Sequence, residues 1–200
     1  LAEMCRMDLP VPPGFTIITE VCDLYYRNNE KWPKGLEAEV DANLAKLEAA
    51  MGAKFGSKDN PLLVSVRSGA AQSLPGMMDT VLNLGLNEDA VEGLIRKTGN
   101  ERFALDSFRR FLQMFGDVAL EIDHHHFEEV LDKVKKEVKA AQDTDLSAAH
   151  LRKVVDGYLK VYKKHTGKEF PRSPKEQLRL SINAVLRSWN NDRCVKYRQL

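Results

Sequence analysis

Apolar residues in the second half of the chain recur at intervals of three and four in five separate segments. This spacing places them on one face of a helix, so each segment is predicted to be an amphipathic helix. The segments are residues 90–95, 103–115, 127–138, 146–162 and 174–189. Residues 91–200 are therefore expected to form a largely helical lobe.

The first half of the chain has a mixed pattern. Leu36–Met51 repeats its apolar residues at helical intervals with charged residues between them, which predicts another amphipathic helix. A shorter helix is expected from Thr19 or Glu20 to Tyr26. A proline-rich turn leads into Thr16-Ile17-Ile18, whose β-branched side chains favour a strand.

Two short segments on either side of a loop of small residues predict a pair of strands. Leu62–Val66 is an apolar run bounded by turn residues, which is typical of a strand that ends in a loop. After the loop at residues 68–76, the segment Asp79–Gly85 alternates and predicts a returning strand. We therefore expect an α+β fold, with a small mixed α/β lobe in residues 1–90 and a soft boundary between residues 86 and 100.

The composition excludes several classes of protein. The chain has 200 residues and 43% apolar content, enough to build the core of one domain or two small lobes. Its 30 basic and 29 acidic residues give a net charge of +1, so no overall field collects nucleic acid or anionic membrane. No apolar run approaches the roughly 20 residues of a membrane span. Three cysteines without paired spacing favour a soluble intracellular protein with reduced thiols.

Both ends of the chain have the character of cut ends. The chain starts at Leu1 in an apolar segment without an initiating methionine, and it stops at Leu200 inside a helical pattern. We therefore expect a fragment of a longer protein.

One arginine stands where a predicted strand meets the loop of small residues. From that position the guanidinium of Arg67 could bind a phosphate through two nitrogens, while small neighbours let backbone N–H groups approach the same anion. The alternative is a structural arginine paired with a carboxylate beside an ordinary hairpin. Met77 and Met78 next to a Pro-Gly turn could likewise simply fill gaps in the core. The residues alone leave these alternatives open.

The segment Val64–Asn87 resembles, almost residue for residue, the signature of the pyruvate, phosphate dikinase family, including its Pro-Gly-Met-Met-Asp-Thr run. Residues 1–15, 101–118 and 170–189 agree with the same family. Phosphoenolpyruvate synthase shares the Val-Arg-Ser core but usually continues with an acidic, Phe-containing loop. The contrast favours the dikinase family over this alternative.

The resemblance implies part of an ATP-grasp-like nucleotide-binding domain that uses ATP and Mg²⁺. The family passes the β-phosphoryl group of ATP through a histidine on a separate phosphohistidine domain to pyruvate, while phosphate takes the γ-phosphoryl group. Arg67 matches its phosphate-contacting arginine, and Gly76, Met77 and Met78 match its mobile loop over the nucleotide. Arg110 matches an arginine of the same cleft, with a role in phosphate contact or docking of the histidine domain.

The resemblance also implies what this chain lacks. A glycine-lysine-glycine segment is expected before Leu1, and the ligands of Mg²⁺ and adenine are expected after Leu200. The chain should therefore contain no catalytic residue and no metal site, and it should be inactive alone. The complete protein is expected to be a homodimer in the cytoplasm, a plastid or another organelle.

Two further features have ordinary explanations. His124, His125 and His126 are adjacent and point about 100° apart on a helix, so a solvated helix start is expected rather than a metal site. Residues 150–179 contain nine Lys or Arg against three acidic residues, a local charge of +6. A helical nucleic-acid-binding or docking module is the alternative here, but the cations fall on several helix faces, which favours a solvated surface.

Overall fold

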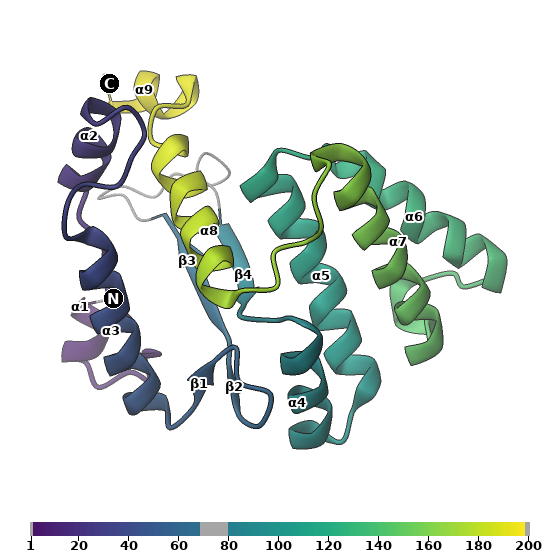
Figure 1. Ribbon diagram of the computed structural model, residues 1–200. Coiled ribbons are helices and arrows are strands. Elements are labelled where there is room, and N and C mark those ends of the chain that lie inside the picture. Colours follow the sequence, from purple (N-terminus) through teal and green to yellow (C-terminus); the bar gives the residue numbers. More distant parts are fainter. Residues whose placement is uncertain (1, 69–79, 199–200) are drawn as a thin grey trace. The chain divides into compact units, whose positions relative to one another are not determined.

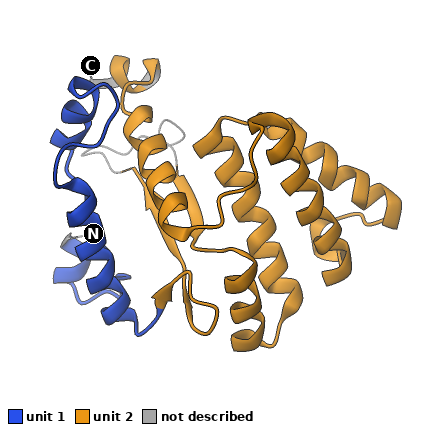
Figure 2. Ribbon diagram, viewed as in Figure 1, with its two compact units in different colours: residues 1–53 blue, residues 54–200 orange. Residues whose placement is uncertain are grey.

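The computed structural model describes residues 2–68 and 80–198 of the chain (Figure 1). By contact clustering the chain divides into two compact units, residues 1–53 and residues 54–200 (Figure 2). The boundary expected between residues 86 and 100 falls inside the second unit. The division of the chain into a mixed lobe in residues 1–90 and a helical lobe in residues 91–200 stays a prediction.

The first unit is helical. Its helices are α1 (Ala2–Arg6), α2 (Glu20–Arg27) and α3 (Leu36–Met51), and the bounds of α3 are those predicted from its spacing. Helix α3 ends because Gly52 adopts a left-handed conformation with φ of 57°, which lets its N–H bond back to the last turn.

The strand predicted at Thr16-Ile17-Ile18 is wrong. The described residues between α1 and α2 contain no strand. β-branched side chains favour extended backbone, but a strand exists only where a neighbouring strand completes the ladder of hydrogen bonds.

The second unit begins with two small sheets. The first pairs β1 (Lys54–Phe55) in parallel with β2 (Pro61–Leu62), and the second pairs β3 (Val64–Arg67) antiparallel with β4 (Thr80–Leu84). The predicted strand Leu62–Val66 is thus split at Leu63, because its two halves pair with different partners. The predicted returning strand is confirmed.

Helices make up the rest of the second unit, as the spacing predicted. They are α4 (Glu88–Thr98), α5 (Glu101–Leu120), α6 (His124–Val138), α7 (Ala148–Thr166), α8 (Pro174–Ser188) and α9 (Asp192–Arg198), with a short 3₁₀ helix η1 (Asp143–Asp145) before α7. Five of them start where a polar side chain accepts a backbone N–H of the first turn. These capping residues are Asn87, Asn100, Asp123, Ser147 and Ser173.

Helix α5 lies at the centre of the second unit (Figure 1). Helices α4, α6, α7 and α8 and strand β4 all pack against it. Its core side is aromatic: Phe111 and Phe115 pack against each other, and both meet the ring of Phe170 nearly edge-on. Helix α8 packs on both strands of the β3–β4 hairpin, so the hairpin is held between helices.

Gln177 attaches α8 to the chain after β4. This fully buried amide accepts a hydrogen bond from the N–H of Gly85 and donates to the carbonyls of Leu86 and Pro171. Because a buried amide is costly without partners, these three bonds fix how α8 sits against the hairpin.

The tight contact of α5 with α6 and α7 predicts the effect of one substitution. A Cβ atom added at Gly116 would lie 2.4 Å from the ring of buried Phe127 and 3.0 Å from the Tyr162 hydroxyl. Gly116→Ala gains about 1 kcal/mol in helix propensity, but overpacking costs about 1–3 kcal/mol and the ring cannot retreat. We expect a lower melting temperature in thermal unfolding, whereas Gly14→Ala, with open space at Cβ, leaves it unchanged.

Candidate functional site

Arg67 lies on the exposed face of the β3–β4 hairpin. Along β3, Val64 and Val66 are half-buried, whereas Ser65 and Arg67 are exposed, so the arginine faces away from the core. Among residues 2–68 and 80–198, Arg67 makes no ion pair with a carboxylate. The phosphate-binding role that the sequence predicts for Arg67 stays a prediction.

A β-bulge in β4 sets the register opposite Arg67. Val64 pairs with Leu84 and Arg67 with Thr80, so β4 has one extra residue between these pairs. Asn83 lies in this bulge and has a left-handed backbone conformation, with φ of 58°. The bulge allows Val81 and Leu84, three residues apart, both to be fully buried.

Strand β4 also connects the hairpin to Arg110 on α5. The N–H of Leu82 lies 3.2 Å from the sulfur of Met114, and Arg110 precedes Met114 by four residues. Residues four apart share one face of a helix, so Arg110 lies one turn from the contact of α5 with β4. Strand β4 therefore packs on α5 one turn away from Arg110.

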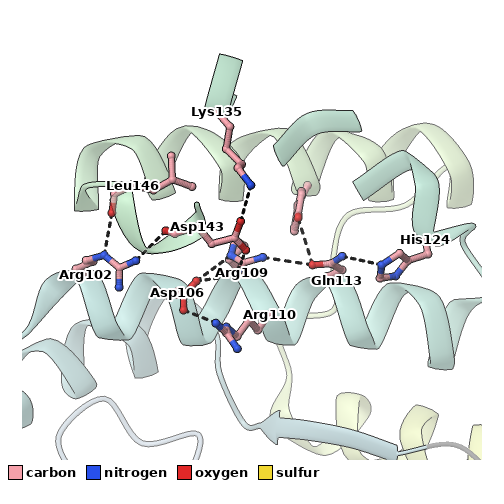
Figure 3. A network of polar contacts seen from close by, with 10 residues as sticks. Arg102, Asp106, Arg109, Arg110, Gln113, His124, Lys135, Asp143 and Leu146 are labelled. Carbon is pink, nitrogen blue, oxygen red and sulfur yellow. Dashed lines mark hydrogen bonds and ion pairs between the residues drawn. The ribbon is translucent and has the colours of Figure 1, made fainter. Parts of the chain in front are cut away.

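Arg110 is exposed but held in place. Its side chain is 62% exposed, and its Nε donates to Oδ2 of Asp106 at 3.0 Å. The other carboxylate oxygen of Asp106 accepts a hydrogen bond from Nε of Arg109 at 2.9 Å and forms an ion pair with Nη2 at 2.8 Å. One carboxylate thus serves two neighbouring arginines (Figure 3).

Arg109 is the buried member of this pair of arginines. Its side chain is 4% exposed and reaches a second carboxylate, Asp143 in η1, at 3.3 Å. Lys135 of α6 pairs with the same Asp143 at 3.0 Å. Burial lowers the pKa of Arg109, but the hydrogen bond and charge of Asp106 outweigh burial and raise it above its ordinary value. Arg109 is therefore a permanent cation that ties α5 to η1, where Asp143 also binds Lys135 of α6.

Gln113 extends the polar network along α5. Its amide oxygen accepts from the hydroxyl of Tyr158 on α7 at 3.4 Å, and its amide nitrogen lies 3.2 Å from Nε2 of His124. Burial raises the pKa of Tyr158 to about 12, so this hydroxyl stays a hydrogen-bond donor at neutral pH. The network crosses from η1 to the start of α6 (Figure 3).

The histidines lie where the sequence placed them. Helix α6 begins at His124, and the side chains of His124 and His125 are exposed and beside carboxylates, so the predicted solvated helix start is confirmed. His126 stacks on His165 of α7 with ring centroids 4.1 Å apart. The described residues contain no group of three or more His, Cys, Asp or Glu that could hold a metal ion.

The basic stretch of residues 150–179 is partly neutralised by neighbouring carboxylates. Among the ion pairs of this stretch, four link α7 or the segment before α8 to carboxylates of the same unit. They are Arg152–Glu101, Lys153–Glu137, Lys163–Glu169 and Arg172–Glu88. This arrangement fits the predicted solvated surface better than a face that binds nucleic acid.

A pocket of about 280 Å³ lies between the C-terminal ends of α5 and α8. Its charged lining is Asp117, Glu121 and Arg187, and the last two approach to 3.5 Å. Two carboxylates outweigh one guanidinium there, so the pocket does not suit a phosphate group. The candidate anion-binding surface remains that of the hairpin and α5.

Three predicted site residues, Gly76, Met77 and Met78, lie outside the described residues. Sequence reasoning missed Asp106 and Arg109, which support Arg110. The sequence did contain a signal. Asp106 precedes Arg109 by three residues and Arg110 by four, and on a helix this spacing allows one carboxylate to reach both arginines.

An exposed guanidinium can bind two oxygens of a phosphate, so Arg67 and Arg110 are candidates for such a contact. Comparison with known proteins makes the class specific: residues 29–200 match the family described as "Pyruvate phosphate dikinase, AMP/ATP-binding domain". The chain is 55% identical to a pyruvate, phosphate dikinase of Giardia intestinalis and 48% identical to that of Clostridium symbiosum. It is 53% identical to the chloroplastic pyruvate, phosphate dikinase 1 of Arabidopsis thaliana.

These similarities cover 100% of this chain and 21 to 23% of the three relatives, so the chain spans less than a quarter of their length. The chain belongs to the pyruvate phosphate dikinase AMP/ATP-binding domain family, as the signature at residues 64–87 predicted. The phosphoenolpyruvate synthase alternative is not favoured, since these relatives are named dikinases. Within the described residues, no helix is long and apolar enough to cross a membrane.

The buried arginine predicts the largest loss of stability among the charged residues discussed above. Arg109→Ala leaves the carboxylates of Asp106 and Asp143 without a shared partner, and breaking a buried pair in this way costs about 3–5 kcal/mol. Asp143 is partly exposed and keeps Lys135, so we expect the low end, about 3 kcal/mol, in urea unfolding. The control Arg152→Ala removes an exposed pair and should cost under about 1 kcal/mol. Equal losses in both variants would contradict a supporting role for Arg109.

Proposed function

We propose that this chain supplies phosphate-binding side chains to the ATP site of a pyruvate, phosphate dikinase. In the complete protein, ATP, pyruvate and phosphate would be converted to AMP, phosphoenolpyruvate and pyrophosphate through a phosphohistidine on a separate domain. The single observation that carries the proposal is Arg67, an exposed arginine without an ion pair among the described residues, at the end of β3 in the family's signature segment.

The chemistry of phosphoryl transfer suits such a surface. The transferred group needs positioning and charge neutralisation more than it needs a covalent partner, so arginines and backbone N–H groups are effective contributors. Arg67 is proposed to bind a phosphate directly, and Arg110 to contact a phosphate or the docking histidine domain. Gly76 would permit close backbone approach, with Met77 and Met78 beside it over the nucleotide.

The finer fold and the metal also belong to this proposal. We infer an ATP-grasp-like arrangement for the complete nucleotide-binding domain, of which this α+β chain forms part. ATP would bind as its Mg²⁺ complex, which neutralises charge on the phosphates. As the family resemblance implies, the protein ligands of Mg²⁺ are expected in another part of the complete protein.

The proposed partners follow from the same reaction. The phosphohistidine domain, pyruvate and phosphate would act on the complete protein, which we infer to be an intracellular homodimer. A nucleic-acid-binding module is not favoured, because carboxylates neutralise part of the basic stretch and the chain belongs to a nucleotide-binding family.

Arg67→Ala in the intact protein tests the proposal. A hydrogen bond to a charged group contributes about 1.5–3 kcal/mol, so we expect the affinity for Mg·ATP to fall about tenfold to a hundredfold. Isothermal titration calorimetry measures it, with Arg152→Ala as a control that removes an arginine paired elsewhere on the unit. Unchanged ATP affinity, or salt-sensitive binding of DNA or RNA that ATP does not affect, would overturn the proposal.

A further inference from the structure

Asp106 is placed to control the orientation of Arg110. Its side chain is only 17% exposed, and one of its oxygens is held by two nitrogens of Arg109 at 2.9 and 2.8 Å. Arg109 is in turn held by Asp143 and lies within reach of Gln113. The carboxylate of Asp106 therefore cannot turn freely toward solvent, and its second oxygen points to one fixed place.

That second oxygen binds Nε of Arg110 and leaves the far edge of the guanidinium open. Within residues 2–68 and 80–198, Nη1 and Nη2 of Arg110 make no hydrogen bond or ion pair. These two nitrogens form the end-on edge that binds two oxygens of a phosphate or carboxylate. Figure 3 shows Asp106 between Arg109 and Arg110, with the Arg110 side chain directed away from α6.

We propose that Asp106 is a positioning residue that holds Arg110 ready to bind a phosphate group of the nucleotide. The inference rests on the proposed function, in which Arg110 contacts a phosphate. An arginine loses much rotational freedom when it binds, and a side chain already held by Nε has lost part of it beforehand. Asp106 thus strengthens binding through Arg110 without touching the nucleotide.

Electrostatics alone predicts the opposite effect, which makes the inference testable. Asp106 is an anion near a site for anions, so removing its charge should tighten binding if orientation were unimportant. In the structure, however, the charge of Asp106 is shared between Arg109 and Arg110. The neighbouring carboxylate, Asp143, also pairs with Lys135. We therefore expect the loss of orientation to outweigh the gain in charge.

The experiment is a double-mutant cycle in the intact protein, with Mg·ATP affinity measured by calorimetry. Asp106→Asn keeps an oxygen for Arg109 but places no anion against Nε of Arg110, so affinity should fall about three- to tenfold. In the Arg110→Ala background, the same change should have no further effect. An effect that persists without Arg110 would reveal structural damage and overturn the inference, as would tighter or unchanged binding in the single variant. Glu137→Gln, which removes the carboxylate of an exposed pair with Lys153, should leave affinity unchanged.

The proposed function and the positioning role of Asp106 can be contradicted separately. If Arg110→Ala leaves ATP affinity unchanged, Arg110 does not contact the nucleotide and the inference falls, while the Arg67 variant still tests the proposed function. Should Asp106→Asn not fold, Arg110→Lys provides the test. Arginine can bind Asp106 through Nε and still offer two nitrogens to a phosphate. Lysine has a single charged nitrogen, so it cannot do both. Binding should then fall nearly as far as in Arg110→Ala, and full affinity would overturn the inference.

Discussion

The burial of α5 on nearly every side is the constraint on which the second unit depends. Four helices and one strand pack against this helix, and its aromatic residues meet Phe170, which comes from the segment before α8. A helix in this position can expose only a narrow strip of its surface. Arg110 belongs to that strip, so the core packing of α5 determines where the exposed cation stands.

Buried charge is placed next to this strip. Arg109 lies in the interior with carboxylates from its own helix and from η1, whereas its neighbour Arg110 is exposed. Burying an ion pair does not by itself make a protein more stable than a well-packed apolar core would. The buried pair instead fixes an orientation. Because Arg109 holds one oxygen of Asp106, the other oxygen faces Arg110 in a fixed direction.

Much of the second unit could be predicted from its sequence, because helical spacing and capping residues are local signals. Asn87 and Asn100, for example, start α4 and α5 through their own side chains. The strand expected at residues 16–18 failed because pairing depends on a distant partner. Arg109 and Arg110 have the same chemistry and differ by about 100° of rotation about α5, so only the tertiary structure shows which one is buried. The family signature made Arg67 a candidate phosphate-binding residue, but it could not show that Asp106 binds both Arg109 and Arg110.

The attachment of the hairpin by side chains has a consequence for its dynamics. The amide protons of Leu82 and Gly85 point to the sulfur of Met114 and to the amide oxygen of Gln177 instead of to another strand. Exchange of these two protons with deuterated water would thus report the separation of α5 and α8 from the hairpin. Exchange elsewhere in β3 and β4 would report the opening of the strands themselves, so the two motions can be followed separately in one protein.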